Sequence, residues 1–353
     1  MGRERMTAGE RMKVLGTGQR PDRVPIILFA LGFCARTVGY SVRSVFEEPE
    51  KSFQAQLWTR EMYGLEGGPS YSFSDSAGWD FGGEIKFPTS EWAQTPTIKR
   101  YPVESEEDVD RLQLPDVKTA GSLPLSMEFS EICERQHMPI MVSVGSPFTW
   151  ATGVCEIAKL CRWMLKNPEV AHRLLRLVTD HCVQVAQYWV DTFGAKRITG
   201  FTATPSEANQ VISPRQFEEF ALPYVKEVHE KVLAMGVRRF FCHICGEQNL
   251  NLPYYTQVPM GDNGIVHFGH EVDLATAIKY FGDTCIIAGN VEPQLIQNGT
   301  PQQVYEACRQ CIEKAKYAPR GYILSPGCEL PPMAPPYNVY MMKKAIDDFG
   351  WYD

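Results

Sequence analysis

Residues 198–246 contain a complete strand–helix–strand unit, and this stretch decides the fold. It begins with the apolar run Ile-Thr-Gly-Phe-Thr-Ala-Thr at Ile198–Thr204 and returns to a second one, Arg-Phe-Phe-Cys-His, at Arg239–His243. Between them, Pro214–Met235 is amphipathic, and Ser213 before Pro214 is typical of a helix start. Short apolar runs joined by long amphipathic segments predict parallel strands with crossover helices.

The same alternation continues on both sides of this unit. Further strands are predicted at Val24–Phe29, Pro139–Val144, Gly264–Phe268, Thr284–Ala288 and Gly321–Leu324. Further helices are predicted at Val154–Leu165, Pro168–Phe193, Asp273–Phe281, Pro301–Tyr317 and Pro336–Phe349. Seven strands with an eighth that is not apparent favour an α/β fold of the (β/α)8 TIM barrel type over an open sheet.

Residues 30–135 depart from this rhythm. They contain Gly67-Gly68-Pro69, Gly82-Gly83 and many aromatic residues. We interpret the region as a partly irregular capping insertion after the first strand that lies over the barrel mouth. The whole chain, 1–353, is then a single TIM-barrel domain.

Composition excludes several classes of protein. The chain has 353 residues, 44% hydrophobic and 22% charged, and no apolar run approaches the roughly 18 residues of a membrane span. The net charge of −7 and the lack of a basic block argue against nucleic acid as a partner. The N-terminus leads into no signal-peptide core, and eleven scattered cysteines indicate a reducing, cytoplasmic environment.

One histidine and two cysteines form a candidate metal site. His243 and Cys245 are two residues apart at the end of one predicted strand, and Cys328 follows the end of another. Because residues i and i+2 of a strand point to the same side, the imidazole and both thiolates can reach one point. One nitrogen and two sulfur ligands, with a fourth position open, make a catalytic zinc set.

The structural alternative is that these residues only fill the core, as free cysteines often do. Loop signals after both cysteines favour the metal site. Gly246 follows Cys245, and Pro331-Pro332 lie shortly after Cys328. Both cysteines are therefore expected at strand ends, where sites form in parallel α/β folds.

With these ligands in place, the chain resembles the uroporphyrinogen decarboxylase superfamily, and within it the zinc-dependent, corrinoid-linked methyltransferases. The His243-x-Cys245…Cys328 set is the most specific of the matching motifs. The other motifs are Glu10-Arg11-Met12 with Pro21–Pro25, Ser213–Phe217 with Leu222-Pro223-Tyr224, and Gly289–Pro293 with Gly299-Thr300-Pro301.

The decarboxylases themselves carry Met-Arg-Gln-Ala-Gly-Arg after the first strand, and this chain has Leu31–Tyr40 there without the arginine pair. Phe73-Ser74-Asp75 does resemble the segment with the decarboxylase's essential aspartate. A decarboxylase also needs no metal. Uroporphyrinogen-type decarboxylation is therefore the less favoured alternative, beside a non-catalytic barrel.

The resemblance implies two reactions of opposite direction. In the first, zinc activates a methyl ether, and cob(I)alamin on a separate corrinoid protein takes the methyl group. In the second, zinc activates a thiol of the coenzyme M type, which takes a methyl group from the methyl-corrinoid. The aromatic insertion favours the first reaction, with an aryl methyl ether. Arg36, Arg43 and Lys86 are basic residues that keep the second reaction open.

The remaining site predictions concern residues expected near the mouth, although each acid among them is also compatible with a plain surface role. His270 and Glu271 follow a strand and are candidates for the fourth zinc position. Tyr337 and Glu329 flank Cys328. We predict catalytic roles for Glu207, His270, Glu271 and Asp75, and cofactor-binding roles for Asn290 and Glu84.

The implied cofactors are Zn²⁺ and a corrinoid. The chain lacks the Asp-x-His-x-x-Gly segment that binds a corrinoid. The resemblance therefore implies that cobalamin arrives on a partner protein that docks over the mouth. A homodimer is compatible with the sequence, which leaves the oligomeric state open.

Overall fold

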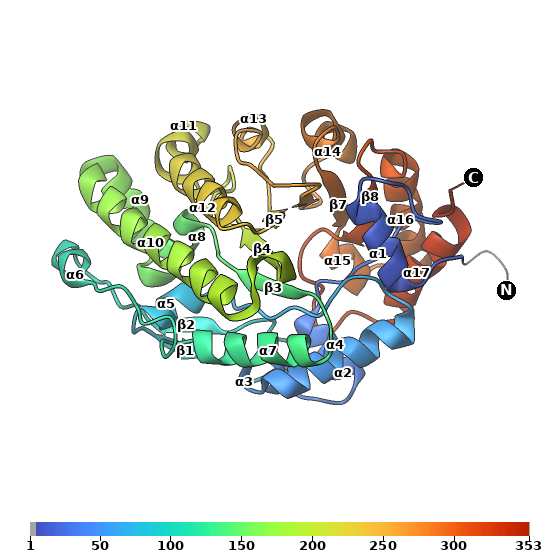
Figure 1. Cartoon of the computed structure of the whole chain (residues 1–353), viewed down its shortest axis with the longest axis horizontal. Helices are drawn as coiled ribbons and strands as arrows, with labels where there is room; N and C mark the ends of the chain where they lie inside the picture. Colours follow the sequence, from blue (N-terminus) through green and yellow to red (C-terminus); the bar gives the residue numbers. More distant parts are fainter. Residues whose placement is uncertain (1–4, 353) are drawn as a thin grey trace.

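A parallel sheet of six strands forms the centre of the computed structural model, which describes residues 5–352 (Figure 1). The strands lie side by side in chain order. They are β3 (Ile140–Ser143), β4 (Ile198–Ala203), β5 (Phe240–Ile244), β6 (Ile265–Phe268), β7 (Ile286–Val291) and β8 (Tyr322–Pro326). Sequential parallel strands with helical crossovers are the arrangement of a TIM barrel, so the predicted fold class is confirmed.

Two irregular segments continue the sheet beyond β8. Ile26 forms a parallel bridge with Leu324, and the amide of Glu66 donates to the carbonyl of Ile26 at 2.9 Å. Gly68 then lies against Pro139, just before β3. The predicted strand at Val24–Phe29 is thus correctly placed but is not a full strand, because Pro25 has no amide hydrogen to donate to a ladder.

The main helices follow the strands as predicted, with two differences. The major ones are α8 (Pro147–Val154), α9 (Ile157–Lys166), α10 (Pro168–Phe193), α12 (Leu222–Ala234), α14 (Leu274–Phe281), α16 (Pro301–Ala315) and α17 (Pro336–Phe349). The shorter ones are η1 (Ala195–Arg197), α11 (Pro214–Gln216), α13 (Leu252–Tyr255) and α15 (Pro293–Asn298).

The first difference is at Val154–Leu165, where one helix was predicted. Cys155 has extended backbone angles and ends α8 before α9 begins. The second is at Pro214–Met235, where a π-helical turn, η2 (Phe217–Ala221), separates α11 from α12. That turn lies next to Pro223, which cannot donate the amide hydrogen bond of a regular helix.

Residues 30–135 are more regular than predicted. They form α2 (Leu31–Thr37), α3 (Ser44–Glu47), α4 (Pro49–Tyr63), α5 (Ser76–Asp80), the antiparallel hairpin β1 (Glu84–Lys86) and β2 (Thr97–Arg100), α6 (Glu106–Arg111) and α7 (Leu123–Arg135). Arg36 donates to the carbonyl of Pro332 at 2.9 Å, and Gln94 to that of Glu329 at 3.0 Å. Parts of the region therefore lie at the carboxyl ends of the strands, while its role as a cap stays a prediction.

The opposite end of the barrel is covered by α1 (Ala8–Gly16). Leu15 of this helix packs with Ile265, Ile286 and Ile323 of the barrel interior. The two ends of the chain meet beside it, because Arg23 forms an antiparallel bridge with Trp351. Figure 1 shows α1 and α17 on the same side of the molecule. Among residues 5–352, no helix combines the length and apolar character that crossing a bilayer requires.

Candidate metal centre

His243, Cys245 and Cys328 come together at the carboxyl end of the barrel. One ligand atom from each lies within 4.8 Å of the others, as the strand spacing predicts. The two Sγ atoms are 3.5 Å apart. Two thiolates on one tetrahedral zinc, at about 2.3 Å each, would be roughly 3.8 Å apart. The site therefore fits zinc with little movement of either cysteine.

His267 fixes the tautomer of His243. Nε2 of His267 is 2.8 Å from the carbonyl oxygen of Pro326, which can only accept, so this nitrogen carries the hydrogen. Burial holds the pKa of His267 well below its ordinary value, so the ring is neutral and its Nδ1 is an acceptor. Nδ1 of His243 lies 2.6 Å from that acceptor and donates to it. The lone pair of His243 is then on Nε2.

Nε2 of His243 is the atom left for a metal. It is buried and has no nitrogen or oxygen partner among residues 5–352. It faces the thiol of Cys328, whose pKa is lowered first by a hydrogen bond from Cys245 and then by His243. The same sulfur contact raises the pKa of Cys245. One thiolate therefore forms readily beside an imidazole nitrogen whose lone pair has no hydrogen-bond partner among the described residues, which is the donor chemistry that zinc prefers.

Two glutamates border the thiols. Oε2 of Glu271 is buried without a hydrogen bond among the described residues, and its charge contributes to raising the pKa of Cys245. Nδ1 of the exposed His270 lies 3.4 Å from this carboxylate. Glu207 is buried, and Thr149 donates to its Oε2 at 2.5 Å while Ser146 donates to Oε1. Burial raises the pKa of Glu207 to about 7.

The family assignment comes from comparison with known proteins. The family described as uroporphyrinogen decarboxylase (URO-D) matches residues 7–349. This chain belongs to the uroporphyrinogen decarboxylase family. A solved structure of a methyltransferase from Methanosarcina mazei superposes with a TM-score of 0.81 at 20% identity, covering 98% of this chain and 99% of that one. That likeness supports the barrel fold.

The curated relatives include both methyltransferases and uroporphyrinogen decarboxylases. A methylated-thiol–coenzyme M methyltransferase from Methanosarcina mazei is 30% identical to this chain over the part that aligns. That part covers 56% of this chain and 52% of the relative's length. A methylcobamide:CoM methyltransferase from Methanosarcina acetivorans is 27% identical over 73% of each chain. A uroporphyrinogen decarboxylase from Trichodesmium erythraeum is 26% identical over 70% of this chain and 69% of its own. The predicted link to the family's methyltransferases is confirmed by the first two.

Three other predicted site residues do not belong to the group of possible metal ligands. Glu84 is on the exposed hairpin and pairs with Lys99 at 2.9 Å and Arg100 at 3.1 Å. Asp75 precedes α5, and burial raises its pKa to about 6. Asn290 donates to the carbonyls of Gly269 and Val272, so it holds the loop that carries Glu271. The roles predicted for these residues stay predictions.

His267 was not among the site residues predicted from the sequence, and Glu329 was predicted only as a neighbour of Cys328. Strand alternation contained a signal for the first, because Ile265 and His267 share a face of β6, as Phe241 and His243 do on β5. Glu329 stands beside Cys328, and burial raises its pKa to about 8. The backbone of Leu31 and Gly32 at the start of α2 faces this carboxylate and offsets part of that rise in pKa. Tyr337, by contrast, is 60% exposed and packs near Tyr340.

Proposed function

We propose that this chain is a zinc-dependent methyltransferase that moves a methyl group between a corrinoid on a separate protein and a small substrate at His243, Cys245 and Cys328. The observation that carries the proposal is the convergence of two thiols and an unpartnered imidazole nitrogen at the barrel mouth. Relatives named as methylcobamide:CoM methyltransferases support the reaction class.

His243 Nε2 and the two Sγ atoms would hold the metal, and Glu271, whose buried Oε2 has no hydrogen-bond partner among the described residues, is a candidate for a fourth position in the absence of substrate. Bound zinc would act as a Lewis acid that lowers the pKa of a substrate thiol. The chain's own residues do the rest. His267 keeps the imidazole oriented, and Glu271 is placed to accept the proton that an incoming thiol releases.

A thiol is the substrate class that the relatives support. The earlier preference for an aryl methyl ether depended on the aromatic residues of the insertion. Those residues pack on one another: the rings of Tyr71 and Phe129 stack at 4.9 Å, and Phe73 lies edge-on to Tyr71 at 5.1 Å. These three rings form core, whereas Trp58 and Trp92 of the insertion are exposed, so the aryl methyl ether stays the alternative substrate.

Arg36 is the basic residue best placed for an anionic group on that thiol. It donates to the carbonyl of Pro332 in the loop after Cys328, and its Nε lies 3.8 Å from the exposed carboxylate of Glu91. Arg43 is paired more closely, with Glu47 at 2.7 Å. A thiolate attacking the methyl carbon of the methyl-corrinoid would form a thioether, and the electron pair of the carbon–cobalt bond would stay on the corrinoid.

The test is a methyl-transfer assay with the zinc-loaded protein. Methylcobalamin is mixed with thiols that do or do not carry an anionic group, and cob(I)alamin formation is followed by absorbance. We expect turnover with the anionic thiols, weakened by Arg36→Met mainly through KM. Parallel assays offer cob(I)alamin with methoxyarenes, and uroporphyrinogen without zinc. Turnover only with methoxyarenes would reverse the proposed direction, and decarboxylation alone would refute the methyltransferase assignment.

A further inference from the structure

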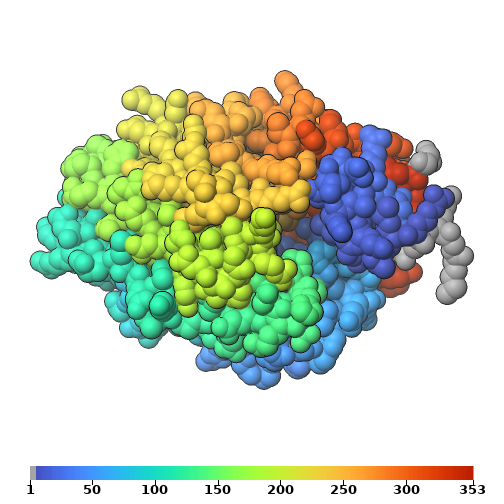
Figure 2. Space-filling view, viewed as in Figure 1, coloured from blue at the N-terminus to red at the C-terminus, as the bar shows by residue number. Residues whose placement is uncertain are grey.

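A second cavity lies inside the barrel, at the end opposite the metal centre. It has a volume of about 660 Å³ and is bordered by α1, α4, the irregular segments 27–30 and 65–70, and residues 137–141. Figure 2 shows the face on which dark blue α1, lighter blue α4 and the green segment before β3 adjoin. Its inner wall is apolar and comprises Ile27, Phe29, Phe201, Phe241, Ile265 and Ile323. Cavities of this volume and character are typical of small-molecule sites.

A layer of aromatic rings separates this cavity from the metal ligands. The ring of Phe29 lies 6.2 Å from that of His243, and the ring of Phe241 lies 5.7 Å from that of His267. Neither these histidines nor the two site cysteines line the cavity. The cavity is therefore distinct from the site proposed for methyl transfer.

One wall carries a guanidinium with two buried nitrogens that make no hydrogen bond to the described residues. Arg60 of α4 lines the cavity, and its Nε and Nη1 are buried with no hydrogen-bond partner among residues 5–352. Burial also lowers the pKa of Arg60. Unpaired buried charges are unfavourable by several kcal/mol, so native arginines in such places are normally paired.

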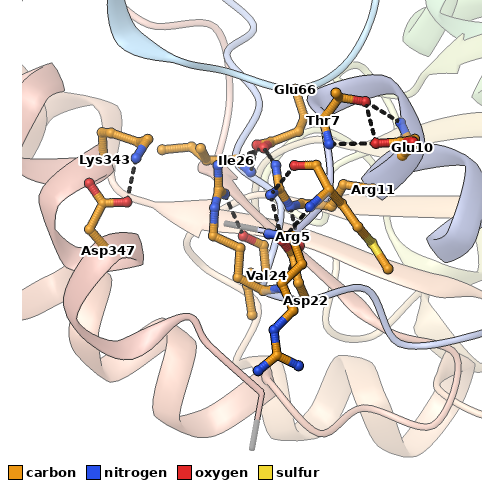
Figure 3. A network of polar contacts seen from close by, with 12 residues as sticks. Arg5, Thr7, Glu10, Arg11, Asp22, Val24, Ile26, Glu66, Lys343 and Asp347 are labelled. Atoms are coloured by element: carbon orange, nitrogen blue, oxygen red, sulfur yellow. Dashed lines mark hydrogen bonds and ion pairs between the residues drawn. The ribbon is translucent and has the colours of Figure 1, made fainter. Parts of the chain in front are cut away.

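The neighbouring carboxylate is already occupied. Glu66 also lines the cavity, but its Oε1 accepts from Arg11 at 2.5 Å and from Arg23 at 2.8 Å, and its Oε2 accepts from the amide of Ile26 at 2.7 Å (Figure 3). Asp22, the other acid of this cluster, binds Arg11 at 2.7 Å. Glu66 also attracts Arg60, but its oxygens are bound by Arg11, Arg23 and the amide of Ile26, so it compensates the charge of Arg60 only in part.

We propose that this cavity binds a small apolar carboxylate. The ligand's carboxylate would pair with the guanidinium of Arg60, whose planar fork suits two parallel hydrogen bonds. Its hydrocarbon or aryl body would lie along Phe201, Phe241 and Ile265. A single, partly compensated cation in an apolar wall favours a monoanion over a phosphate ester, which would bring a second charge into the cavity.

The experiment is isothermal titration calorimetry on the full-length, zinc-loaded protein with octanoate as the probe and 1-octanol as its uncharged counterpart. We expect octanoate to bind more tightly than octanol. Arg60→Met, which keeps the apolar stem, should weaken octanoate by about tenfold or more and leave octanol unchanged. Lys13→Met removes an exposed cation from the rim of the same cavity and should change neither affinity.

A second variant tests the location without touching Arg60. Thr199→Phe fills the cavity from β4, so it should weaken both probes while circular dichroism and zinc content stay unchanged. The proposal is overturned if folded wild-type protein binds no octanoate at millimolar concentration. Equal octanoate affinity in wild type and Arg60→Met, or unchanged binding in Thr199→Phe, would overturn it as well.

Discussion

The orientation of His243, a proposed zinc ligand, is set by the histidine next to it, His267. His267 is held by the carbonyl of Pro326 and, in turn, receives the Nδ1 hydrogen of His243. Because the carbonyl of Pro326 orients His267, and His267 accepts the hydrogen of His243 Nδ1, the lone pair of His243 is left on Nε2. A site formed this way depends on residues that never touch the metal.

Removing the inner histidine should therefore weaken metal binding. His267→Phe keeps the ring volume but deletes the acceptor of His243, so we expect zinc affinity to fall by about 10–100-fold. A chelator competition titration measures this. His229→Phe is the matched control, because His229 is also buried, neutral and hydrogen-bonded, to Thr202 at 3.0 Å and Pro259 at 2.9 Å. Equal zinc loss in both variants would mean that general destabilisation, and not orientation, is the cause.

Glu207 should give the protein a pH-dependent stability. Burial raises its pKa from the ordinary value of 4.5 to about 7, so between these values the native state keeps a proton that the unfolded chain has lost. Stability then falls as pH rises through this window, by at most about 3 kcal/mol. Glu207→Gln mimics the protonated form and should gain stability relative to wild type between pH 5 and 8.

Urea unfolding of both proteins across this range checks the prediction. A constant difference between the two free energies of unfolding at all pH values would show that Glu207 titrates normally.

At the scale of elements, the site depends on loops that follow β5, β6 and β8. The loop after β6 carries Glu271 and is tied to β7 by two hydrogen bonds from Asn290, at 2.9 and 2.6 Å. The loop after β8 carries Cys328 and meets α2 through Glu329. Strand ends therefore place the ligands, and cross-loop contacts set their orientation.

Asn290→Ala should loosen the β6 loop. Two buried carbonyls lose their donor, so we expect a loss of about 2 kcal/mol in the free energy of unfolding together with a fall in methyl transfer. Asn338→Ala is the control: it also removes two donations to backbone carbonyls, those of Ile296 and Gly299, neither of which lies in a loop that carries a candidate ligand. It should cost similar stability and leave kcat unchanged. If both variants lose activity alike, the loop has no specific role.

Helices and strands with a strong hydrophobic periodicity were predicted correctly from the sequence. Segments without such a periodicity were not recognised. The helix predicted at Pro168–Phe193 has those bounds in the structure, because it combines a cap signal with an unbroken apolar stripe. The segment around Gly68 gave no strand signal, although it lies between Ile26 and β3, because two glycines and a proline carry no alternation.

The same distinction holds at the metal centre. The convergence of His243, Cys245 and Cys328 was predicted from i, i+2 spacing and strand ends, which are local patterns. Glu271 was placed near them from its strand end, but the pairing of His243 with His267 joins neighbouring strands and depends on register. Register is a tertiary property, so the orientation of His243 could not be read from the residues alone.

At the scale of the whole molecule, a buried cluster of Arg11, Asp22, Arg23 and Glu66 joins α1 to the two irregular segments that continue the sheet. Glu66→Gln would leave Arg11 and Arg23 buried beside a neutral side chain. We expect a loss of about 3–5 kcal/mol in the free energy of unfolding, measured by urea denaturation. Glu10→Gln, which affects only the exposed cap of α1, should cost about 1 kcal/mol or less. A small effect of Glu66→Gln would show that the cluster does not stabilise the closed barrel.

The central claim is that His243, Cys245 and Cys328 bind a zinc ion at the carboxyl end of the barrel. The metal content of the purified protein tests this claim most directly. The zinc content of wild-type protein purified without chelator is compared with that of Cys245→Ala and of a control, Cys242→Ala. Cys242 is buried in β5, three residues before Cys245, and is not a candidate ligand. We predict about one zinc per chain in wild type and in Cys242→Ala, and none in Cys245→Ala. A wild-type protein without zinc, or a Cys245→Ala protein that retains it, would contradict the account.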